Sequence, residues 1–318
     1  MSIRIIDANL NRTREGLRVV EDIARFILED REITKKIKGI RHRIADLSPK
    51  KTILFRDIEG DIGRKIEDYK KKDWKEILKA NIKRTEEALR VLEEFLGEEF
   101  RKIRYEVYGI EKGLFKPKIK GLYLIIDPGL CEPISLAKEA VEAGVKIIQL
   151  RDKRGDIREF LRLAEGIMKL SDEICLIIND RLDVALTVGA DGLHIGQDDI
   201  PISYAKRVFP GIIGVSTHSL DEAIKAEEEG ADYIGLGPIF PTETKPGLYP
   251  IGPEIIKEVK EKINIPVVAI GGITLENIEE VKYADSIAVL SAILESKNIK
   301  ETCFRFIENL RFLQKIDF

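Results

Sequence analysis

Hydrophobic positions divide the chain into two parts with different periodicities. In the first third, apolar residues such as Leu10, Leu17 and Val20 recur at the spacing of one helix face. Further along, short apolar runs alternate with amphipathic stretches such as PISLAKEAVEAG and ENIEEVKYA. This pattern predicts an all-helical domain at 1–112, a linker at 113–120 and an α/β domain at 121–318.

The first region contains an internal repeat. Residues 8–21 align with residues 80–93 at an offset of 72, and nine of the fourteen positions are identical. We therefore expect two similar helices that pack against each other about a local pseudo-twofold axis. The polar residues of the first copy recur every third position, which drifts by about 60° per step on a helix, so they cannot all face one site. Surface ion pairs and a functional role both stay open for Asn9, Arg12, Glu15, Arg18 and Glu21.

The second region predicts eight short strands, each followed by a helical pattern. Eight such units in about 200 residues are typical of a (β/α)8 TIM barrel. A doubly wound open sheet is the alternative, but no GxGxxG follows the first strand, which argues against a dinucleotide-binding fold. The expected strands are 122–126, 146–150, 175–178, 192–195, 212–215, 233–236, 267–270 and 286–290.

Composition and charge restrict the classes of partner. The 53 basic and 56 acidic side chains leave a net charge of -3, so no basic excess favours nucleic-acid binding. The cysteines, Cys131, Cys175 and Cys303, are far apart and form no CxxC pair, which favours a reducing cytoplasm. The polar N-terminus predicts no signal peptide, and no run of about 18 apolar residues predicts a membrane span. Small molecules are the expected partners, and a homo-oligomer stays open.

Polar side chains gather where the predicted strands end, which is where barrel enzymes carry their active sites. Asp180 and Asp199 follow adjacent strands, and two carboxylates that also leave room for water and phosphate oxygens suit Mg²⁺. Arg151, Lys153 and Lys245 supply cations nearby. The pattern predicts a Mg²⁺-bound polyphosphate near the second to fourth strands. We expect His194, at the end of the fourth strand, to pack there rather than to ligate a metal.

The last two strands predict a second anion site. Gly271-Gly272 follows the seventh strand and Ser291 follows the eighth, the usual phosphate position of these barrels. A segment rich in Pro and Gly, residues 241–252, is long enough to act as a lid over the site, and it carries Thr242 and Thr244. One monophosphate and one polyphosphate are therefore expected on the same rim.

Residues 121–310 resemble the thiamine-phosphate synthase family. The resemblance is carried by GLYLIID, IIQLRDK, INDRLDVAL, GADGLHIGQDD, GVSTHS, GLGPIFPTETK, IGGIT and VLSAI, in order. It implies a transferase that joins 4-amino-2-methyl-5-hydroxymethylpyrimidine diphosphate to a thiazole monophosphate, with or without a carboxyl group. The products would be thiamine phosphate and diphosphate, formed by Mg²⁺-assisted dissociation of the pyrimidine diphosphate.

The resemblance also implies a role for each matching residue. Asp180 and Asp199 would bind Mg²⁺, and Arg151, Lys153, Ser216 and Lys245 would act in catalysis. The pyrimidine diphosphate would be held by Gln149, Arg151, Lys153, Asn179, Ser216 and Lys245. The thiazole phosphate would be held by Thr242, Thr244, Gly272, Leu290 and Ser291.

One departure and one alternative accompany this resemblance. Pro246-Gly247 follows the TETK motif where the family often has another polar residue, which puts the lid motion in question. A thiazole tautomerase or a ligand-binding relative is the alternative. A tautomerase needs no diphosphate and metal site, so the alternative is disfavoured by the joint retention of Arg151, Lys153, Asp180, Asp199 and Lys245.

The first region resembles the hydroxymethylpyrimidine phosphate kinase family that occurs alone or fused to this synthase. DANLNRTREGLRVVEDIARFIL, IRHRIADL, RDIEGDIG and ANIKRTEEALRVLEE carry the resemblance. It implies ATP-dependent phosphorylation of the pyrimidine monophosphate. No GxxxxGK[ST] phosphate loop is present, so no ATP site is assigned. A dimerisation or regulatory module is the alternative.

Overall fold

The computed structural model describes residues 2–49, 73–153, 155–242 and 249–315. The chain forms two compact units, Met1–Lys116 and Pro117–Phe318. The expected linker at 113–120 begins too early, because the last helix of the first unit continues to Phe115. Leu114 is buried against the helical core, and this burial extends the helix into the expected linker.

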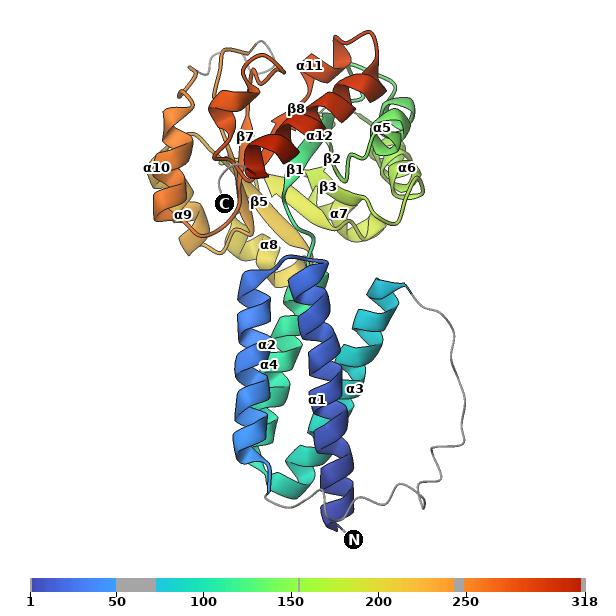
Figure 1. Ribbon diagram of the computed structural model, residues 1–318. Helices are drawn as coiled ribbons and strands as arrows, with labels where there is room; N and C mark the ends of the chain where they lie inside the picture. Colours follow the sequence, from blue (N-terminus) through green and yellow to red (C-terminus); the bar gives the residue numbers. More distant parts are fainter. Residues whose placement is uncertain (1, 50–72, 154, 243–248, 316–318) are drawn as a thin grey trace. The chain divides into compact units, whose positions relative to one another are not determined.

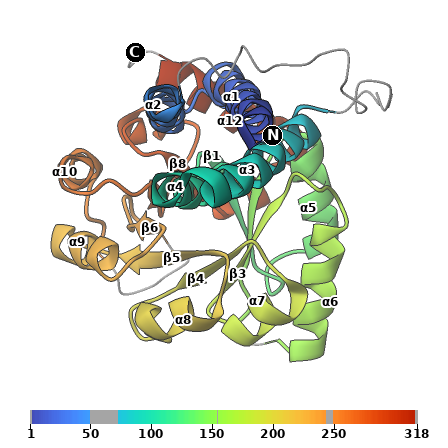
Figure 2. The same ribbon diagram turned by 90° about the horizontal axis from the view of Figure 1, so that it is seen from below.

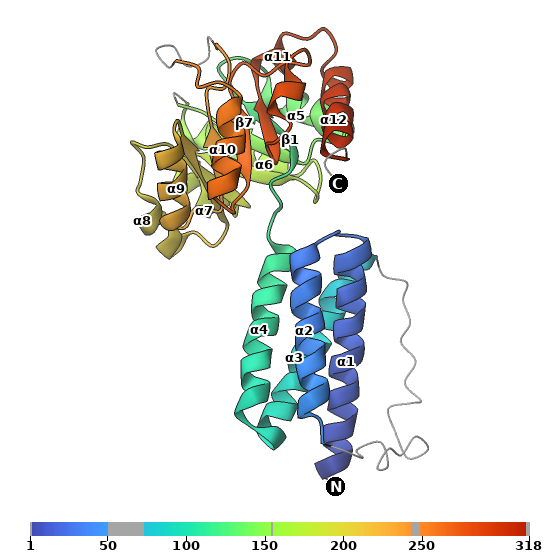
Figure 3. The ribbon, with the colours of Figure 1, turned by 60° about the vertical axis from the view of Figure 1, so that its left-hand side comes forward.

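The first unit is a set of helices, as the sequence predicted (Figure 1). Figure 3 shows them running alongside one another. Aspartates cap two of the N-termini: Asp30 accepts a hydrogen bond from the Ile33 amide, and Asp73 accepts one from Glu76. The helices are α1 (Ser2–Phe26), α2 (Arg31–Leu47), α3 (Trp74–Leu96) and α4 (Glu98–Phe115).

The two copies of the repeat lie in α1 and α3, which pack against each other more extensively than any other pair of the described elements. The two helices approach closely at Gly16, where a Cβ atom would lie 2.3 Å from Oγ1 of Thr85 and 2.9 Å from the carbonyl oxygen of Asn81. Only glycine allows this backbone approach. The prediction that the two repeat helices pack together is confirmed.

The buried asparagine and threonine side chains of the repeat form hydrogen bonds within their own helices. Asn9 donates to the Ile5 carbonyl at 2.8 Å, and Thr13 donates to the Asn9 carbonyl at 2.8 Å. The second copy repeats both bonds at the same lengths, from Asn81 to Ile77 and from Thr85 to Asn81. The other polar residues of the first copy lie on different faces of α1, as their spacing of three positions predicted. Glu21 is buried beside Arg41, whereas Arg12, Glu15 and Arg18 are exposed.

The second unit is a closed barrel of eight parallel strands in sequential order, so the barrel prediction is confirmed and the open sheet is wrong. Each predicted strand is present within one or two residues of its expected ends. The strands are β1 (Gly121–Ile126), β2 (Ile147–Leu150), β3 (Cys175–Asn179), β4 (Gly192–Ile195), β5 (Ile212–Thr217), β6 (Tyr233–Leu236), β7 (Val267–Ile270) and β8 (Ser286–Val289).

Helices cover the outside of the barrel (Figure 2). The described helices of this unit include none long and apolar enough to cross a membrane, and the same is true of the first unit's described residues. They are α5 (Pro133–Glu142), α6 (Ile157–Met168), α7 (Leu182–Val188), α8 (Ile202–Val208), α9 (Leu220–Glu228), α10 (Glu254–Lys262), the 3₁₀ helix η3 (Ile278–Val281), α11 (Ser291–Leu294) and α12 (Ile299–Lys315).

Side-chain alternation along the strands separates two cores. On β2, Ile148 belongs to the core between strands and helices, whereas Ile147 belongs to the cluster inside the barrel. The same interior cluster contains two buried tyrosines, Tyr123 of β1 and Tyr233 of β6. The inward face of β2 therefore continues from Ile147 to Gln149, toward the end of the barrel where the strands terminate.

Candidate functional site

A single cavity brings together residues from the ends of most strands. Every predicted substrate-binding residue that the structure describes lines it, with the exception of the more exposed Lys153. Thr244 and Lys245 lie outside the described residues, as do the RDIEGDIG motif of the first unit and residues 243–248 of the expected lid. The predicted residues in the wall are Gln149, Arg151, Asn179, Ser216, Thr242, Gly272, Leu290 and Ser291.

Arg151 is held in place by a residue that sequence reasoning missed. Its Nη1 lies 2.8 Å from Oδ2 of Asp127, and both side chains are largely buried. Asp127 immediately follows β1, so it occupies on that strand the position where other strands carry polar groups. This regularity was a signal for Asp127 in GLYLIID. An ion pair sheltered from water orients the guanidinium, which presents its donors in a fixed plane.

Asp180 and Asp199 lie next to each other, as expected from adjacent strand ends. Burial, together with the hydrogen bond and charge of Asp199, raises the pKa of Asp180 to about 6, while Lys153 and Arg151 oppose the shift. The Nζ atom of Lys153 lies 3.8 Å from Oδ2 of Asp180. Asp180 also has a positive φ of 60°, which an aspartate adopts more readily than most residues.

Such a pair is a fitting place for a divalent cation. Two carboxylates that repel each other when both are ionised gain from a positive charge between them. Their oxygen atoms are the ligands that Mg²⁺ prefers, and Mg²⁺ commonly takes only one or two protein carboxylates. Among the described residues no group of three or more His, Cys, Asp or Glu side chains could hold a metal. The residues present thus fit a cation completed by substrate oxygens rather than a fully protein-bound site.

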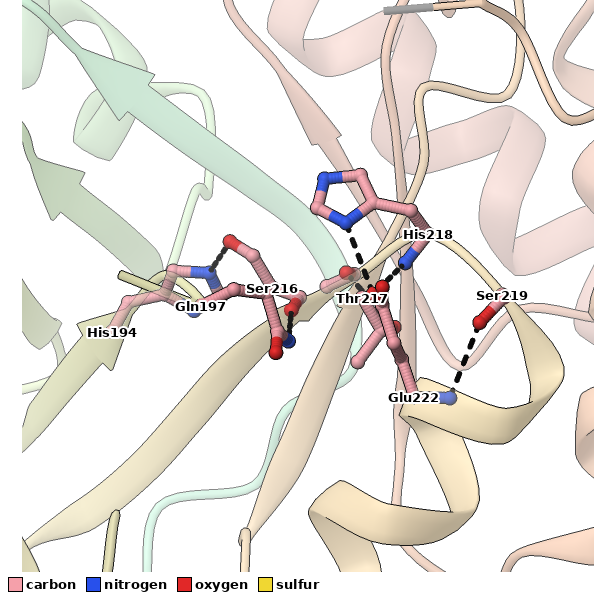
Figure 4. A network of polar contacts seen from close by, with 8 residues as sticks. His194, Gln197, Ser216, Thr217, His218, Ser219 and Glu222 are labelled. Carbon is pink, nitrogen blue, oxygen red and sulfur yellow. Dashed lines mark hydrogen bonds and ion pairs between the residues drawn. The ribbon is translucent and has the colours of Figure 1, made fainter. Parts of the chain in front are cut away.

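A row of hydrogen bonds crosses the floor of the cavity between β2 and β5. Gln149 Nε2 donates to the Tyr123 hydroxyl at 2.9 Å, and the hydroxyls of Tyr123 and Tyr233 are 3.0 Å apart. The Tyr233 hydroxyl lies 3.0 Å from Nδ1 of His194. The Nε2 atom of His194 lies 3.0 Å from Oγ of Ser216, as Figure 4 shows. Burial raises the pKa of both tyrosines well above its usual value, so both hydroxyls keep their protons.

His194 behaves as the sequence predicted, because it packs at the end of β4 and bonds to neighbours. Gln197 fixes the backbone beside it by donating to the Ser216 carbonyl at 2.6 Å (Figure 4). His218, which also lines the cavity, contacts Glu222, whose carboxylate lies 3.0 Å from Nδ1. Sequence reasoning missed Tyr123 and Tyr233, because an inward aromatic on a strand cannot be distinguished from ordinary core until its hydroxyl has a partner.

The glycines after β7 form a tight backbone turn, which lines the side of the cavity away from Arg151. Gly271 and Gly272 have φ values of 98° and 63°. A Cβ on Gly272 would lie 2.4 Å from the Pro241 carbonyl oxygen, so only glycine fits. Asn277 closes the turn by donating to the Gly272 carbonyl at 2.9 Å. Leu290 and Ser291 follow at the start of the short helix α11, the arrangement in which barrel enzymes bind phosphate.

Comparison with known proteins matches each unit to a protein family. The family model described as thiamine monophosphate synthase matches residues 122–293, and that of the ThiD2 family matches residues 4–113. A Synechocystis thiamine-phosphate synthase is 37% identical over 96% of this chain and 96% of its own. One from Gloeobacter violaceus is 36% identical over 97% and 96%.

A solved structure resembles the barrel unit. Thiamine phosphate pyrophosphorylase from Pyrococcus furiosus is 38% identical, with a TM-score of 0.58, and the match covers 61% of this chain and 96% of that one. Tryptophan synthase from Mycobacterium tuberculosis, at 13% identity and a TM-score of 0.51, shares the fold alone.

Proposed function

The chain belongs to the thiamine-phosphate synthase family, and we propose that its barrel joins 4-amino-2-methyl-5-hydroxymethylpyrimidine diphosphate to 4-methyl-5-(2-phosphoethyl)thiazole or its carboxylated form. The observation that carries this proposal is the division of one cavity into two anion-binding sides. Arg151 lines the cavity on one side and, like Lys153, interacts electrostatically with Asp180 of the Asp180–Asp199 pair, which lies outside the lining. The glycine turn of Gly271-Gly272 lines the cavity on the other side. A diphosphate with its cation suits the first side, and a monophosphate suits the second.

The reaction we propose needs no general base. The C–O bond between the pyrimidinylmethyl group and diphosphate breaks, and the bonding electrons leave with the diphosphate. The ring amino group stabilises the resulting cation, and the thiazole nitrogen captures it. The protein must therefore stabilise negative charge that develops on the leaving group and hold the nucleophile close.

The chain's own residues can meet both demands. Arg151, oriented by Asp127, and Lys153 would hydrogen-bond the departing diphosphate, and the predicted Lys245 would add a third cation. Asp180 and Asp199 would hold Mg²⁺, which supplies further positive charge to the phosphate oxygens. Gly272, Leu290 and Ser291, with Thr242 and the predicted Thr244, would seat the thiazole phosphate. Gln149, Asn179 and Ser216 would contact the pyrimidine diphosphate.

A direct assay tests this proposal. The full chain is incubated with the pyrimidine diphosphate, the thiazole phosphate and Mg²⁺, and thiamine phosphate and diphosphate are quantified. We expect equal amounts of both products, loss of turnover with a chelator, and recovery when Mg²⁺ is restored. An Asp180→Asn, Asp199→Asn variant should stay inactive at Mg²⁺ concentrations that restore the wild type. Normal turnover of that variant without Mg²⁺ would contradict the metal site.

The helical unit has a second candidate function. Its match to the ThiD2 family and its resemblance to the pyrimidine phosphate kinases support a proposal that it phosphorylates the pyrimidine monophosphate, with ATP as donor. This would produce the diphosphate that the barrel consumes. The full chain, given ATP, the pyrimidine monophosphate and the thiazole phosphate, should then make thiamine phosphate. If product forms only when the diphosphate is supplied, the unit is a dimerisation or regulatory module.

A further inference from the structure

We propose that Tyr123, Tyr233 and His194 are positioning residues that connect Gln149 to Ser216 by a chain of hydrogen bonds. All donors in this hydrogen-bond chain point from Gln149 toward Ser216. The direction decides that Gln149 offers a hydrogen-bond acceptor to a ligand and that Ser216 offers a donor. Four consecutive contacts of 2.9–3.0 Å connect these five side chains. They come from β1, β2, β4, β5 and β6, so the chain exists only in the folded barrel.

The direction follows from counting protons. A tyrosine hydroxyl has one proton, and a buried hydroxyl that accepted from both of its partners would leave that proton unpaired at a cost in free energy, so it donates to one partner and accepts from the other. Gln149 Nε2 is a donor only, and it faces the Tyr123 oxygen. Tyr123 must then donate to Tyr233, and Tyr233 must donate to Nδ1 of His194. The ring of His194 consequently carries its proton on Nε2 and donates it to Ser216 Oγ.

Both ends of the chain are thereby assigned. Ser216 Oγ accepts from His194, which leaves its own O–H free to donate into the cavity. At the other end the amide nitrogen of Gln149 is engaged, and no described residue donates to its Oε1, which is an acceptor. The reverse direction would exchange these roles. It would place the His194 proton on Nδ1, so the tautomer of this ring reports the direction.

The barrel makes room for this chain at two glycines. A Cβ on Gly214 of β5 would lie 2.0 Å from Cζ of Tyr233, and a Cβ on Gly235 of β6 would lie 3.1 Å from Cε1 of His194. Both rings therefore occupy space that any other residue would fill. Ring contacts reinforce the arrangement, because the centroids of His194 and Tyr233 are 5.5 Å apart and those of the two tyrosines 6.2 Å.

The consequence for ligand choice rests on the proposed function. A heterocycle on this floor must offer a donor to Gln149 Oε1 and an acceptor to the Ser216 hydroxyl. An aminopyrimidine offers an amino N–H and unprotonated ring nitrogens. Its 4-oxo analogue presents a carbonyl and a ring N–H, which is the opposite pattern. The hydrogen-bond chain therefore predicts that the site prefers the aminopyrimidine over its 4-oxo analogue, because a polar site rejects a ligand that leaves its buried groups unpaired.

Histidine NMR tests the chain without reference to activity. The protein has three histidines, so long-range ¹H–¹⁵N spectra of the full chain are simple, and a His194→Gln variant identifies the signal. We expect a neutral ring with Nε2 protonated and Nδ1 unprotonated. A ring protonated on Nδ1, or on both nitrogens, would overturn the proposal. Failure to make thiamine phosphate would affect the proposed function alone.

Two tyrosine variants show which hydroxyl fixes the tautomer of His194. Tyr233→Phe removes the central hydroxyl but keeps the ring, and we expect mixed His194 tautomers. Tyr123→Phe removes the hydroxyl that connects Tyr233 to Gln149, and we expect the fraction of the Nε2–H tautomer to fall, but less than in Tyr233→Phe because Tyr233 can still donate to Nδ1. Tyr204→Phe, on the exposed face of α8, is the matched control and should leave the spectrum unchanged. An unchanged His194 tautomer in Tyr233→Phe would overturn the proposal.

Kinetics provide the second readout. In Tyr233→Phe we expect kcat/KM for the pyrimidine diphosphate to fall by about tenfold in a folded protein, whose melting temperature is lower than that of Tyr204→Phe because two buried hydrogen bonds are lost. We also expect this variant to discriminate less between the 4-amino substrate and a 4-oxo analogue that competes with it for the site. A merely structural role would weaken binding of both ligands equally, and that result would refute the assignment of donor and acceptor.

Discussion

The two units bury polar side chains in opposite ways. In the helical unit, Asn9 and Thr13 bond to carbonyls four residues earlier, and the second repeat does the same. In the barrel, Tyr123 and Tyr233 bond across the interior although 110 positions separate them. Local bonds satisfy polar groups wherever a helix forms, whereas bonds between strands require the whole barrel. At the cavity of the barrel, the buried polar side chains therefore have partners that are distant in sequence.

The largest effect should follow from removing a distant partner at the cavity. We expect Arg151→Ala to lower kcat by about 10²–10³, because it removes charge stabilisation of the leaving diphosphate. Steady-state kinetics of thiamine phosphate formation measure this. Arg162→Ala, whose guanidinium pairs with Glu159 on the exposed face of α6, is the control and should be near wild type. Wild-type turnover in Arg151→Ala would contradict the proposed diphosphate side.

Crowding the barrel interior should have the next largest effect. In Gly214→Ala the new methyl would overlap the Tyr233 ring, so we expect the free energy of unfolding of the barrel to fall by about 1–3 kcal/mol. Tyrosine near-UV circular dichroism during urea unfolding measures this, and the fluorescence of Trp74 identifies the transition of the helical unit, to which Tyr105 and Tyr108 also contribute. We also expect the signal of His194 to change. A stability equal to wild type would show that the ring has room to move, and would weaken the account of this glycine.

An equivalent test of the helical unit uses Gly16. Gly16→Ala would press a methyl group on Thr85 and the Asn81 carbonyl, so we expect a loss of about 1–3 kcal/mol. Gly39→Ala in α2 is the control, since its Cβ would meet nothing within 4 Å, and it should stabilise by about 0.5–1 kcal/mol. Fluorescence of Trp74, the single tryptophan, follows this unit during urea unfolding. We expect the free energy of unfolding to fall in Gly16→Ala and to rise in Gly39→Ala, and changes of the same sign would contradict this expectation.

The smallest effect should come from the local bonds. Thr13→Val and Thr85→Val should each cost about 1 kcal/mol, equally within error, because each removes one buried bond to its own helix. Thr187→Val is matched, since its hydroxyl makes the same bond, 2.7 Å long, on the exposed face of α7, and it should cost less. Urea unfolding measures all three. A marked inequality between Thr13 and Thr85 would break the equivalence of the repeats.

Much of the fold could be predicted because its determinants are local or periodic. The strands of the barrel are apolar runs of four to six residues between helical patterns, and the repeat identified α1 and α3 as partners. The helical end of the expected linker was missed, because the burial of Leu114 depends on packing with other helices. The residues predicted for the cavity could be found because strand ends in a barrel converge on one rim.

By itself the sequence determined the barrel, the helical repeat and the rim of charged and glycine residues, since periodicity and position along a strand dictate where a side chain points. Only the tertiary structure decided that Asp127 orients Arg151 and that two core tyrosines connect Gln149 to His194 and Ser216. A hydrogen bond needs two atoms within about 3 Å. For residues on different strands, closure of the barrel alone creates that distance.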